Sequence, residues 1–309
     1  MTDSQRTAIA HYAKVELAKR GLLNFALATD SRYTANWHHE LLCTYLDRFV
    51  AGEIKRLMIF MPPRHGKSEL VSRKLPAYIF GRYPDTSIIA TSYTADLAGR
   101  MNRDVQRIID GDSYRLIFPK TVLAQNRDYV RNNDMFEIVG HRGVYRAAGV
   151  GGGITGMGGN FLIVDDPHKS REEANSAAIR DRVYEWYTST LYSRLEEIND
   201  MGGILLTCTR WHEDDLAGRL LRLADTDPLA DRWHVLNLPA IAEGALHPDD
   251  PRADGEALWP SVRPFDRHKG QHWKLRLGGT VPAKAVADGR RHVQNRLVAV
   301  LARIAVKLD

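Results

Sequence analysis

The segment that most constrains this fold is Met61-Pro-Pro-Arg-His-Gly-Lys-Ser68, which directly follows the apolar run Arg56–Met61. The apolar run has the length of a buried strand, Pro62-Pro63 ends it, and residues 67–80 have the pattern of a helix. In such a strand–loop–helix unit, backbone N–H groups and the helix N-terminus point into the loop and favour an anion. The segment therefore predicts a phosphate-binding loop.

The predicted ATP-binding residues are those of the loop itself: Pro63, Arg64, His65, Gly66, Lys67 and Ser68. Lys67 would reach the β- and γ-phosphates, and the Ser68 hydroxyl would bind Mg²⁺. Met61 stands where the usual pattern has its first glycine. Gly-Lys-Ser in an ordinary strand-to-helix turn is the alternative, and the strand–loop–helix context favours the phosphate loop.

A second signal is the apolar stretch Phe161–Val164, which ends in Asp165-Asp166-Pro167. Open α/β sheets bind ligands at the carboxyl ends of their strands, where Asp165 is predicted to lie. Asp165 suits the Mg²⁺ shell, directly or through water, and Asp166 would position or activate the attacking water. A buried strand with an exposed acidic turn is the alternative for this segment taken alone.

A third signal is the stretch Leu205–His212, in which a buried strand ends in Thr207, Thr209 and Arg210. Hydroxyls and an arginine at a strand end can sense the γ-phosphate and relay its loss. We therefore predict a coupling role for these three residues. On this segment alone, a strand end with ordinary turn residues fits equally well.

The rest of the chain alternates predicted strands with predicted helices. The helices cover residues 5–29 with a break at Gly21, 37–50, 67–80, 95–109, 175–198 and 216–223; the strands cover 56–61, 87–92, 161–165, 203–208 and 233–238, with a hairpin at 136–139 and 144–147. This alternation predicts an α/β fold with a parallel sheet and helices on both faces.

The net charge of +5 invites a nucleic-acid interpretation, but its distribution argues against using it. Residues 261–309 hold 11 Lys/Arg and 3 Asp/Glu, which leaves 32 Lys/Arg and 35 Asp/Glu in residues 1–260. All the excess positive charge therefore lies in the C-terminal tail. Bulk charge gives no reason to assign DNA binding to the main domain.

Several weaker features bear on other functions. Cys43 and Cys208 lie in apolar surroundings, which predicts buried thiols in a reducing compartment. No apolar run has the length of a membrane span, and the N-terminus lacks an apolar export core. The histidines show no metal-ligand spacing, so zinc is not expected. Asp214-Asp215 fit helix caps better than a nuclease site.

Three motifs in this order indicate a P-loop NTPase of the RecA/ASCE-like kind, with an extra strand between the nucleotide-binding strand and the acidic one. Within that class, the sequence resembles the terminase large-subunit family. The resemblance extends from about residue 35 to 260 and rests on these segments: HHELL, MPPRHGKSE, SIIATSYTADLA, FLIVDDPHK, TCTRWHEDDLAGRL, LNLPAIAE and ALWP.

The resemblance implies an ATP- and Mg²⁺-dependent motor that moves double-stranded DNA into a procapsid in the bacterial host cytoplasm. It also implies a portal protein and a terminase small subunit as partners, and a homo-oligomeric ring on the portal. It supports Asp165–Asp166 as the metal and hydrolysis pair and Thr207–Thr209 as the coupling motif. Arg64 resembles the loop arginine that neutralises charge in the transition state, so we predict Arg64 and Asp166 as catalytic residues.

Two alternatives remain open: another P-loop DNA translocase or helicase, and an inactive, truncated prophage relic. The predicted organisation is a helical lead-in at residues 1–50, a P-loop ATPase domain at 51–260 and a basic tail at 261–309.

The tail departs from the family's pattern, in which a nuclease domain follows the motor. Back-translation of residues 273–298 with a one-base shift can read GSYDWAALYQQRPSPTAGGMFKTDWF, which resembles the family's segment between motor and nuclease. We therefore hypothesise a frameshift near residue 261, poor order over residues 265–309, and no endonuclease activity.

Overall fold

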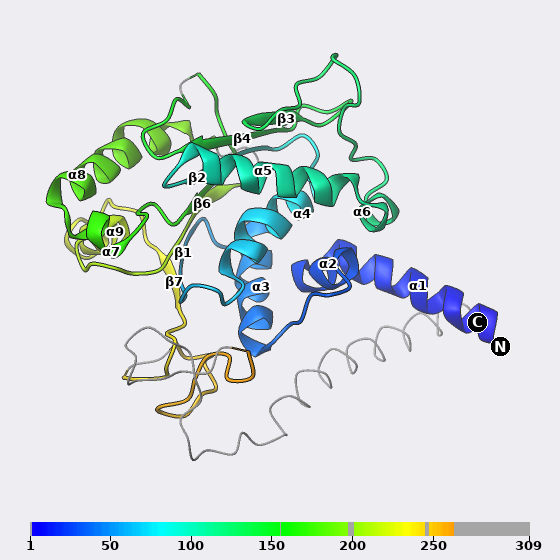
Figure 1. Cartoon of the computed structure of the whole chain (residues 1–309), viewed down its shortest axis with the longest axis horizontal. Coiled ribbons are helices and arrows are strands. Elements are labelled where there is room, and N and C mark those ends of the chain that lie inside the picture. Colours follow the sequence, from blue (N-terminus) through cyan, green and yellow to red (C-terminus); the bar gives the residue numbers. More distant parts are fainter. Residues whose placement is uncertain (1, 155, 197–200, 245–246, 263–309) are drawn as a thin grey trace.

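A seven-stranded sheet forms the centre of the protein, in the order β3-β4-β2-β5-β6-β1-β7 (Figure 1). The structure is a computed structural model that describes residues 2–154, 156–196, 201–244 and 247–262. Every pair of neighbouring strands is parallel except β3 and β4, which form the predicted antiparallel hairpin. The strands are β1 (Arg56–Phe60), β2 (Ser87–Ser92), β3 (Met135–Glu137), β4 (Val144–Gly149), β5 (Phe161–Asp165), β6 (Gly203–Cys208) and β7 (His234–Asn237).

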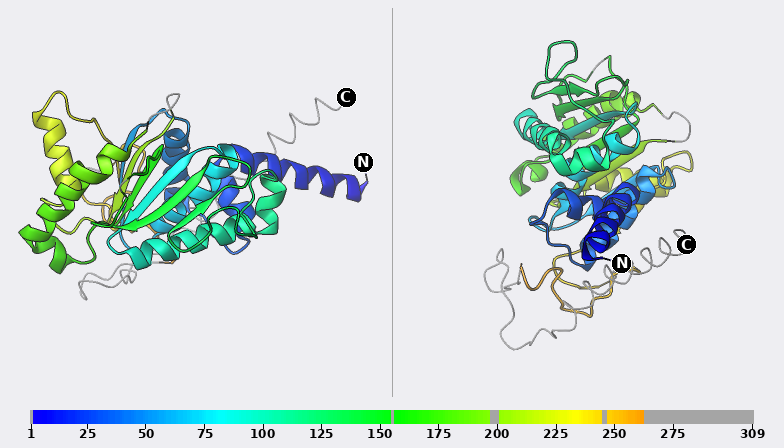
Figure 2. Two further views of the ribbon diagram at one scale, coloured as in Figure 1. Left: turned by 90° about the horizontal axis from the view of Figure 1, so that it is seen from above. Right: turned by 90° about the vertical axis from the view of Figure 1, so that its right-hand side faces the viewer.

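Helices cover both faces of this sheet, as predicted (Figure 2). The helices are α1 (Asp3–Arg20), α2 (Leu22–Thr29), α3 (Trp37–Val50), α4 (Leu75–Arg82), α5 (Ala95–Asp110), α6 (Asp112–Ile117), α7 (Arg171–Asn175), α8 (Ala177–Trp186) and α9 (Leu216–Thr226). A short π-helical segment, Glu69–Lys74, directly precedes α4. Another, Tyr187–Leu191, directly follows α8 and continues into a 3₁₀ turn at Tyr192–Arg194.

Two apolar cores result, one on each face of the sheet. Successive side chains of a strand point to opposite faces, and β5 shows this clearly. Phe161 and Ile163 pack with residues of α1 to α6, whereas Leu162 and Val164 pack with residues of α8 and α9. Burial on both faces explains why the central strands are continuous apolar runs.

Helix α1 extends away from the body of the molecule (Figures 1 and 2). Only Ala13 and Ala18 of this helix are buried, whereas α2 and α3 contribute many residues to the first core. Gly21, in an extended conformation, separates α1 from α2 at the predicted break. The division at residues 50 and 260 stays a prediction, and the predicted properties of the tail lie outside the described residues.

The predicted helix over residues 175–198 is wrong in its length and continuity. Ser170 caps a separate short helix, α7, by accepting the backbone N–H of Glu173. Ser176 then takes an extended conformation before α8 begins, and the helical segment ends at Arg194. The break within the predicted range falls at Ser176, whose extended backbone separates α7 from α8.

Candidate nucleotide site

The phosphate loop lies at the carboxyl end of β1, beside the carboxyl ends of β6 and β5. The strand order β5-β6-β1 places one strand between the loop strand and the acidic strand, as the motif order predicts. The register pairs Phe60 with Cys208 and Asp165 with Thr207. Three motifs that are far apart in the sequence therefore meet at one edge of the sheet.

Lys67 is buried and pairs with both acids of the second motif. Its Nζ lies 2.6 Å from Asp166 Oδ1 and 4.0 Å from Asp165 Oδ1. The side chain is only 4 % exposed, so water screens these charges little. A phosphate entering the loop would compete with Asp166 for this ammonium group.

Asp165 is almost fully buried at the end of β5. Its Oδ2 accepts a hydrogen bond of 2.6 Å from Ser72 Oγ, whereas its buried Oδ1 accepts none within the described part of the chain. Burial raises the pKa of Asp165, while the Lys67 ammonium and the hydroxyls of Ser72 and Ser68 act in the opposite direction. An oxygen that is buried without a hydrogen-bond donor, next to a hydroxyl, is a suitable ligand for Mg²⁺.

Asp166 connects all three motifs. Besides Lys67, its Oδ1 accepts the backbone N–H of Thr209 at 2.9 Å, and its own N–H donates to Thr207 O at 2.8 Å. Its φ of 48° is in the left-handed region, which a non-glycine residue occupies only when its surroundings enforce it. The contacts to β6 and Lys67 supply that constraint and aim the carboxylate at the loop.

The threonines of the third motif tie β6 to the loop strand. Thr207 Oγ1 donates to Ile59 O, and Thr209 Oγ1 donates to Met61 O, both at 3.2 Å. Arg210 points elsewhere: its guanidinium lies over the Phe60 ring and pairs with Asp215. The structure thus places the two threonines at the loop and Arg210 beside helix α9.

Two adjacent histidines hold the phosphate loop from the side of α3. The Nε2 atoms of His39 and His38 lie 3.0 Å and 3.3 Å from the carbonyl oxygen of His65. Because a carbonyl oxygen only accepts, each Nε2 carries a proton and donates it. His39 Nδ1 in turn accepts the N–H of Asn36, the residue that caps α3. We call this arrangement of His38 and His39 on the His65 carbonyl the histidine clamp.

Both clamp histidines are kept neutral by burial. Burial lowers the pKa of His39 to about 4 and that of His38 to about 2. The ring of Trp259 packs edge-on against both, with centroid distances of 4.8 and 5.4 Å. Gly66 fits beneath the His39 ring only because it lacks a Cβ, and its φ of 85° also favours glycine.

The comparison with known families now adds to this geometry. Residues 58–264 match the family model described as terminase large subunit, T4likevirus-type, N-terminal, which covers more than half of the chain. The chain belongs to this terminase family. A search of curated protein sequences found no match.

Three solved structures resemble this terminase chain. The HK97 bacteriophage large terminase is 13% identical with a TM-score of 0.43, and the match covers 80% of this chain and 47% of that one. A mutant of the Thermus phage P74-26 large terminase ATPase domain is 17% identical with a TM-score of 0.35, and the match covers 58% of this chain and 66% of that one. The same domain without the mutation is 20% identical with a TM-score of 0.30, and the match covers 51% of this chain and 61% of that one. The chain spans less than two thirds of each of these chains.

The remaining predicted residues of this terminase site lie on the outer part of the loop. Pro63 and Arg64 are exposed, and the Pro63 carbonyl lies 2.9 Å from His65 Nδ1. Arg64 has a φ of 62°, a second left-handed non-glycine residue in the site. His65 is buried and contributes its backbone carbonyl to the clamp. All these assignments to ATP and Mg²⁺ stay predictions.

Sequence reasoning missed Ser72 and the histidine clamp. Ser72 lies one helical turn after Ser68, so a serine at that spacing was an available signal. The two clamp histidines follow Asn36, a helix-capping residue, but their contact with the loop spans more than 25 residues. No local pattern reports such a contact.

Three other findings concern the described residues alone. Both predicted buried thiols, Cys43 and Cys208, are indeed free and buried. In these parts of the chain no cluster of three or more His, Cys, Asp or Glu residues is arranged to hold a metal ion. No helix there is long and apolar enough to cross a membrane.

Proposed function

We propose that this terminase-family chain hydrolyses ATP with Mg²⁺ and uses the energy to move double-stranded DNA into a procapsid. One observation carries the proposal: Lys67, Asp165 and Asp166 meet at the carboxyl edge of the sheet, beside a glycine-containing loop that opens a helix. P-loop NTPases use a loop lysine to bind the phosphates and strand-end acids for Mg²⁺ and the attacking water, and this edge of the sheet supplies both kinds of group.

Lys67 and the loop amides bind the phosphates in this proposal. The hydroxyl of Ser68 and the Oδ1 atom of Asp165 would hold Mg²⁺, which neutralises charge on the phosphate oxygens. Ser72 occupies Oδ2 of Asp165 with its hydrogen bond, which leaves Oδ1 as the oxygen that would hold the ion. Ser72 is thus a positioning residue for the metal ligand.

Asp166 orients the attacking water and accepts its proton. Its carboxylate is paired with the Lys67 ammonium group. A phosphate that binds Lys67 would break this ion pair and free the carboxylate to act on water. Arg64 supplies positive charge to the transition state from the exposed side of the loop. Because Asp166 also accepts the Thr209 amide, a change at the γ-phosphate reaches the coupling motif through one hydrogen bond.

The proposed partners follow from the family. Double-stranded DNA is the substrate that is moved, the portal protein and the terminase small subunit are the assembly partners, and a homo-oligomeric ring forms on the portal. The site of action is the host cytoplasm. The predicted lack of endonuclease activity and the frameshift hypothesis concern residues outside the described part and stay predictions.

The first test compares ATP hydrolysis in Mg²⁺ by the wild type, Lys67→Ala and Asp166→Asn. Lys67→Ala should lose nucleotide binding and hydrolysis together. Asp166→Asn should bind nucleotide at least as well as the wild type, because Lys67 loses a competing charge, yet should not hydrolyse it. Asparagine tolerates the left-handed backbone of residue 166, so this variant isolates the charge.

Lys74→Ala is the matched control for Lys67→Ala. Lys74 is also buried on the helical segment after the loop, but it donates to Thr29 rather than to the acids. Equal loss in both lysine variants would indicate a folding defect and contradict the assigned role of Lys67.

The kind of DNA that stimulates ATP hydrolysis distinguishes a packaging motor from a helicase. Stimulation by double-stranded DNA supports a packaging motor, whereas stimulation by single strands alone indicates a helicase. A folded wild type that neither binds nor hydrolyses ATP, with or without DNA, would support the inactive relic.

A further inference from the structure

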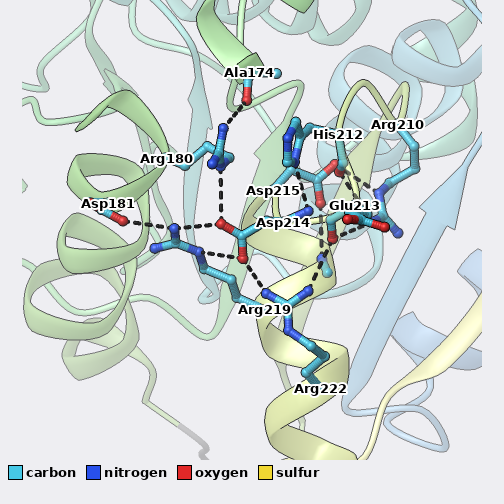
Figure 3. Close-up of polar contacts among 11 residues, drawn as sticks. Ala174, Arg180, Asp181, Arg210, His212, Glu213, Asp214, Asp215, Arg219 and Arg222 are labelled. Carbon is cyan, nitrogen blue, oxygen red and sulfur yellow. Dashed lines mark hydrogen bonds and ion pairs between the residues drawn. The ribbon is translucent and has the colours of Figure 1, made fainter. Parts of the chain in front are cut away.

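Three arginine side chains surround the carboxylate of Asp214 where β6 leads into α9 (Figure 3). Arg180 Nε lies 3.1 Å from Oδ2, Arg219 Nη2 lies 2.8 Å from the same atom, and Arg222 pairs with Oδ1. These hydrogen bonds hold the pKa of Asp214 well below its usual range, and the bond from Arg219 has the largest effect. We call Asp214 and its three arginines the arginine cluster.

The loop from Arg210 to Asp215 is fastened to helix α9. Arg210 Nε donates to Asp215 Oδ2 at 2.8 Å, and Asp215 Oδ1 caps α9 by accepting the Gly218 N–H at 2.9 Å. A Cβ on Gly218 would overlap the carbonyl oxygen of Glu213, so the loop lies directly on the helix. The loop and α9 therefore form one unit.

Helix α8 belongs to the same unit through its first two turns. Arg180 comes from α8, and its Nη1 also donates to the carbonyl of Ala174 in α7 at 2.7 Å. Asp181 pairs with Arg219 at 2.7 Å, and the Arg219 guanidinium lies over the Tyr184 ring. The arginine cluster is thus shared between α8, α9 and the loop.

The other end of this loop begins at the proposed nucleotide site. Thr209 donates its N–H to Asp166, and the next residue, Arg210, rests on the ring of Phe60 in β1. A contiguous series of contacts therefore runs from Asp166 through residues 209–215 to both helices, and packed side chains and ion pairs of this kind can carry coupling between distant parts of a protein.

We propose that Asp214 is a positioning residue that makes α8 and α9 move with the coupling loop when the γ-phosphate is lost. The inference rests on the proposed hydrolysis of ATP and adds the structural element that responds to it. Asp214 is suited to this role because its charge holds together three guanidinium groups that would otherwise repel one another. The apolar contacts of each helix with the sheet do not depend on this charge.

The test is amide hydrogen exchange of the full chain with Mg²⁺ and either ADP or a non-hydrolysable ATP analogue. In the wild type, exchange should differ between the two nucleotides in the phosphate loop, in residues 209–226 and in residues 177–186. In Asp214→Asn the difference in residues 177–186 should be lost, while that in the phosphate loop remains. Asp214→Glu, which retains the charge, should restore the wild-type response.

Asp110→Asn is the matched control. Asp110 also pairs with an arginine from another segment, Arg131, and its side chain is 31% exposed compared with 29% for Asp214. It lies on α5, on the other face of the sheet, so this variant should keep the nucleotide response in α8. Arg180→Gln removes the ion pair between Asp214 and α8, leaves the Asp181–Arg219 pair in place, and serves as the second variant if Asp214→Asn unfolds.

The outcomes separate this inference from the proposed function. If the wild type shows no nucleotide-dependent exchange in the phosphate loop, both are overturned. If the loop responds but α8 does not, or if Asp214→Asn and Arg180→Gln respond like the wild type, only the role of Asp214 is overturned. A kinetic measurement agrees with the role when DNA-stimulated kcat falls several-fold in Asp214→Asn while the KM for ATP is unchanged.

Discussion

The histidine clamp and the arginine cluster both support the candidate site, but they do so with opposite physical means. The clamp consists of neutral, buried rings that donate to one backbone carbonyl. The cluster consists of charged side chains, one of which, Arg222, is 55% exposed. Buried neutral hydrogen bonds are sensitive to geometry, whereas ion pairs near the surface keep their attraction over a range of distances.

This difference matches what each region has to do. In the proposed function, the backbone of the phosphate loop must keep its shape while nucleotide enters and leaves, so a clamp that tolerates little movement is appropriate. Helices α8 and α9 have to shift together in our proposal, so a cluster whose partners can slide without losing their attraction is appropriate. The predictions below test this contrast.

The largest expected effect is that of Gly66→Ala. The new Cβ would overlap the His39 ring and would sit on a backbone with a φ of 85°. Overlap and strain together should lower the free energy of unfolding by about 4 kcal/mol and abolish nucleotide binding. Urea denaturation and an ATP-binding titration measure the two effects.

Gly140→Ala is the control for backbone strain alone. Gly140 has a φ of 73°, but a Cβ there would meet nothing within 4 Å. This variant should lose only about 1 kcal/mol. If Gly66→Ala is no less stable than Gly140→Ala, the His39 ring does not restrict the loop and the clamp is incorrect.

The next effect is a dependence of stability on pH that arises from the clamp. The pKa of His39 falls from 6.5 to about 4 on folding, so between these values the unfolded chain binds a proton that the folded chain does not. Stability from this group is therefore fully present above pH 6.5 and is lost as the pH falls towards 4, by about 3 kcal/mol.

The measurement is the difference in unfolding free energy between wild type and His39→Gln across this interval. Burial raises the pKa of Asp47 to about 6, so Asp47 gains a proton in the folded state and changes stability in the opposite direction. Both proteins contain Asp47, so subtraction removes its effect. Parallel pH profiles would contradict the assigned state of His39. The arginine cluster should change the free energy of unfolding only at lower pH than this interval. Because the pKa of Asp214 is held below its usual range, the stabilisation from its charge is lost only when the pH falls far enough to protonate it.

A smaller effect is expected on nucleotide binding in His39→Gln near neutral pH. The glutamine amide can donate to the His65 carbonyl, but its oxygen does not occupy the ring position from which His39 Nδ1 accepts the Asn36 N–H, so it cannot bridge both groups as the histidine ring does. The KM for ATP should rise roughly tenfold, equivalent to about 1.4 kcal/mol, with a smaller change in kcat. His141→Gln is the control, since His141 contacts Asp85 away from the site. An unchanged KM in His39→Gln would show that the clamp does not shape the loop.

The sequence alone predicted the parts of the fold that depend on local pattern. The limits of β2, β5 and β6 agree with the predicted strands because each is a short apolar run between turn residues. Asp215 caps α9 as predicted, since capping needs only the residues next to it. Parallel pairing then brings the phosphate loop, the acids and the threonines to one edge of the sheet, as the motif order indicated.

The parts that could not be predicted depend on contacts between distant segments. The histidine clamp joins residues 38 and 39 to residue 65, and the arginine cluster joins α8 to the start of α9. Asp214 was interpreted with Asp215 as a helix cap, but its side chain binds three arginines instead. Periodicity identifies which face of a helix is buried, but not which charged side chains meet across two helices.

The smallest expected effect is that of salt, and it should separate the two regions. Raising monovalent salt from about 0.1 M to about 1 M shortens the screening distance from ~10 Å to ~3 Å. A double-mutant cycle of Asp214→Asn with Arg222→Gln should therefore show a coupling energy below about 1 kcal/mol that decreases with salt. A cycle of His39→Gln with Trp259→Phe should be insensitive to salt, because both rings are neutral and in contact. Equal salt dependence in the two cycles would mean that charge does not distinguish the two regions.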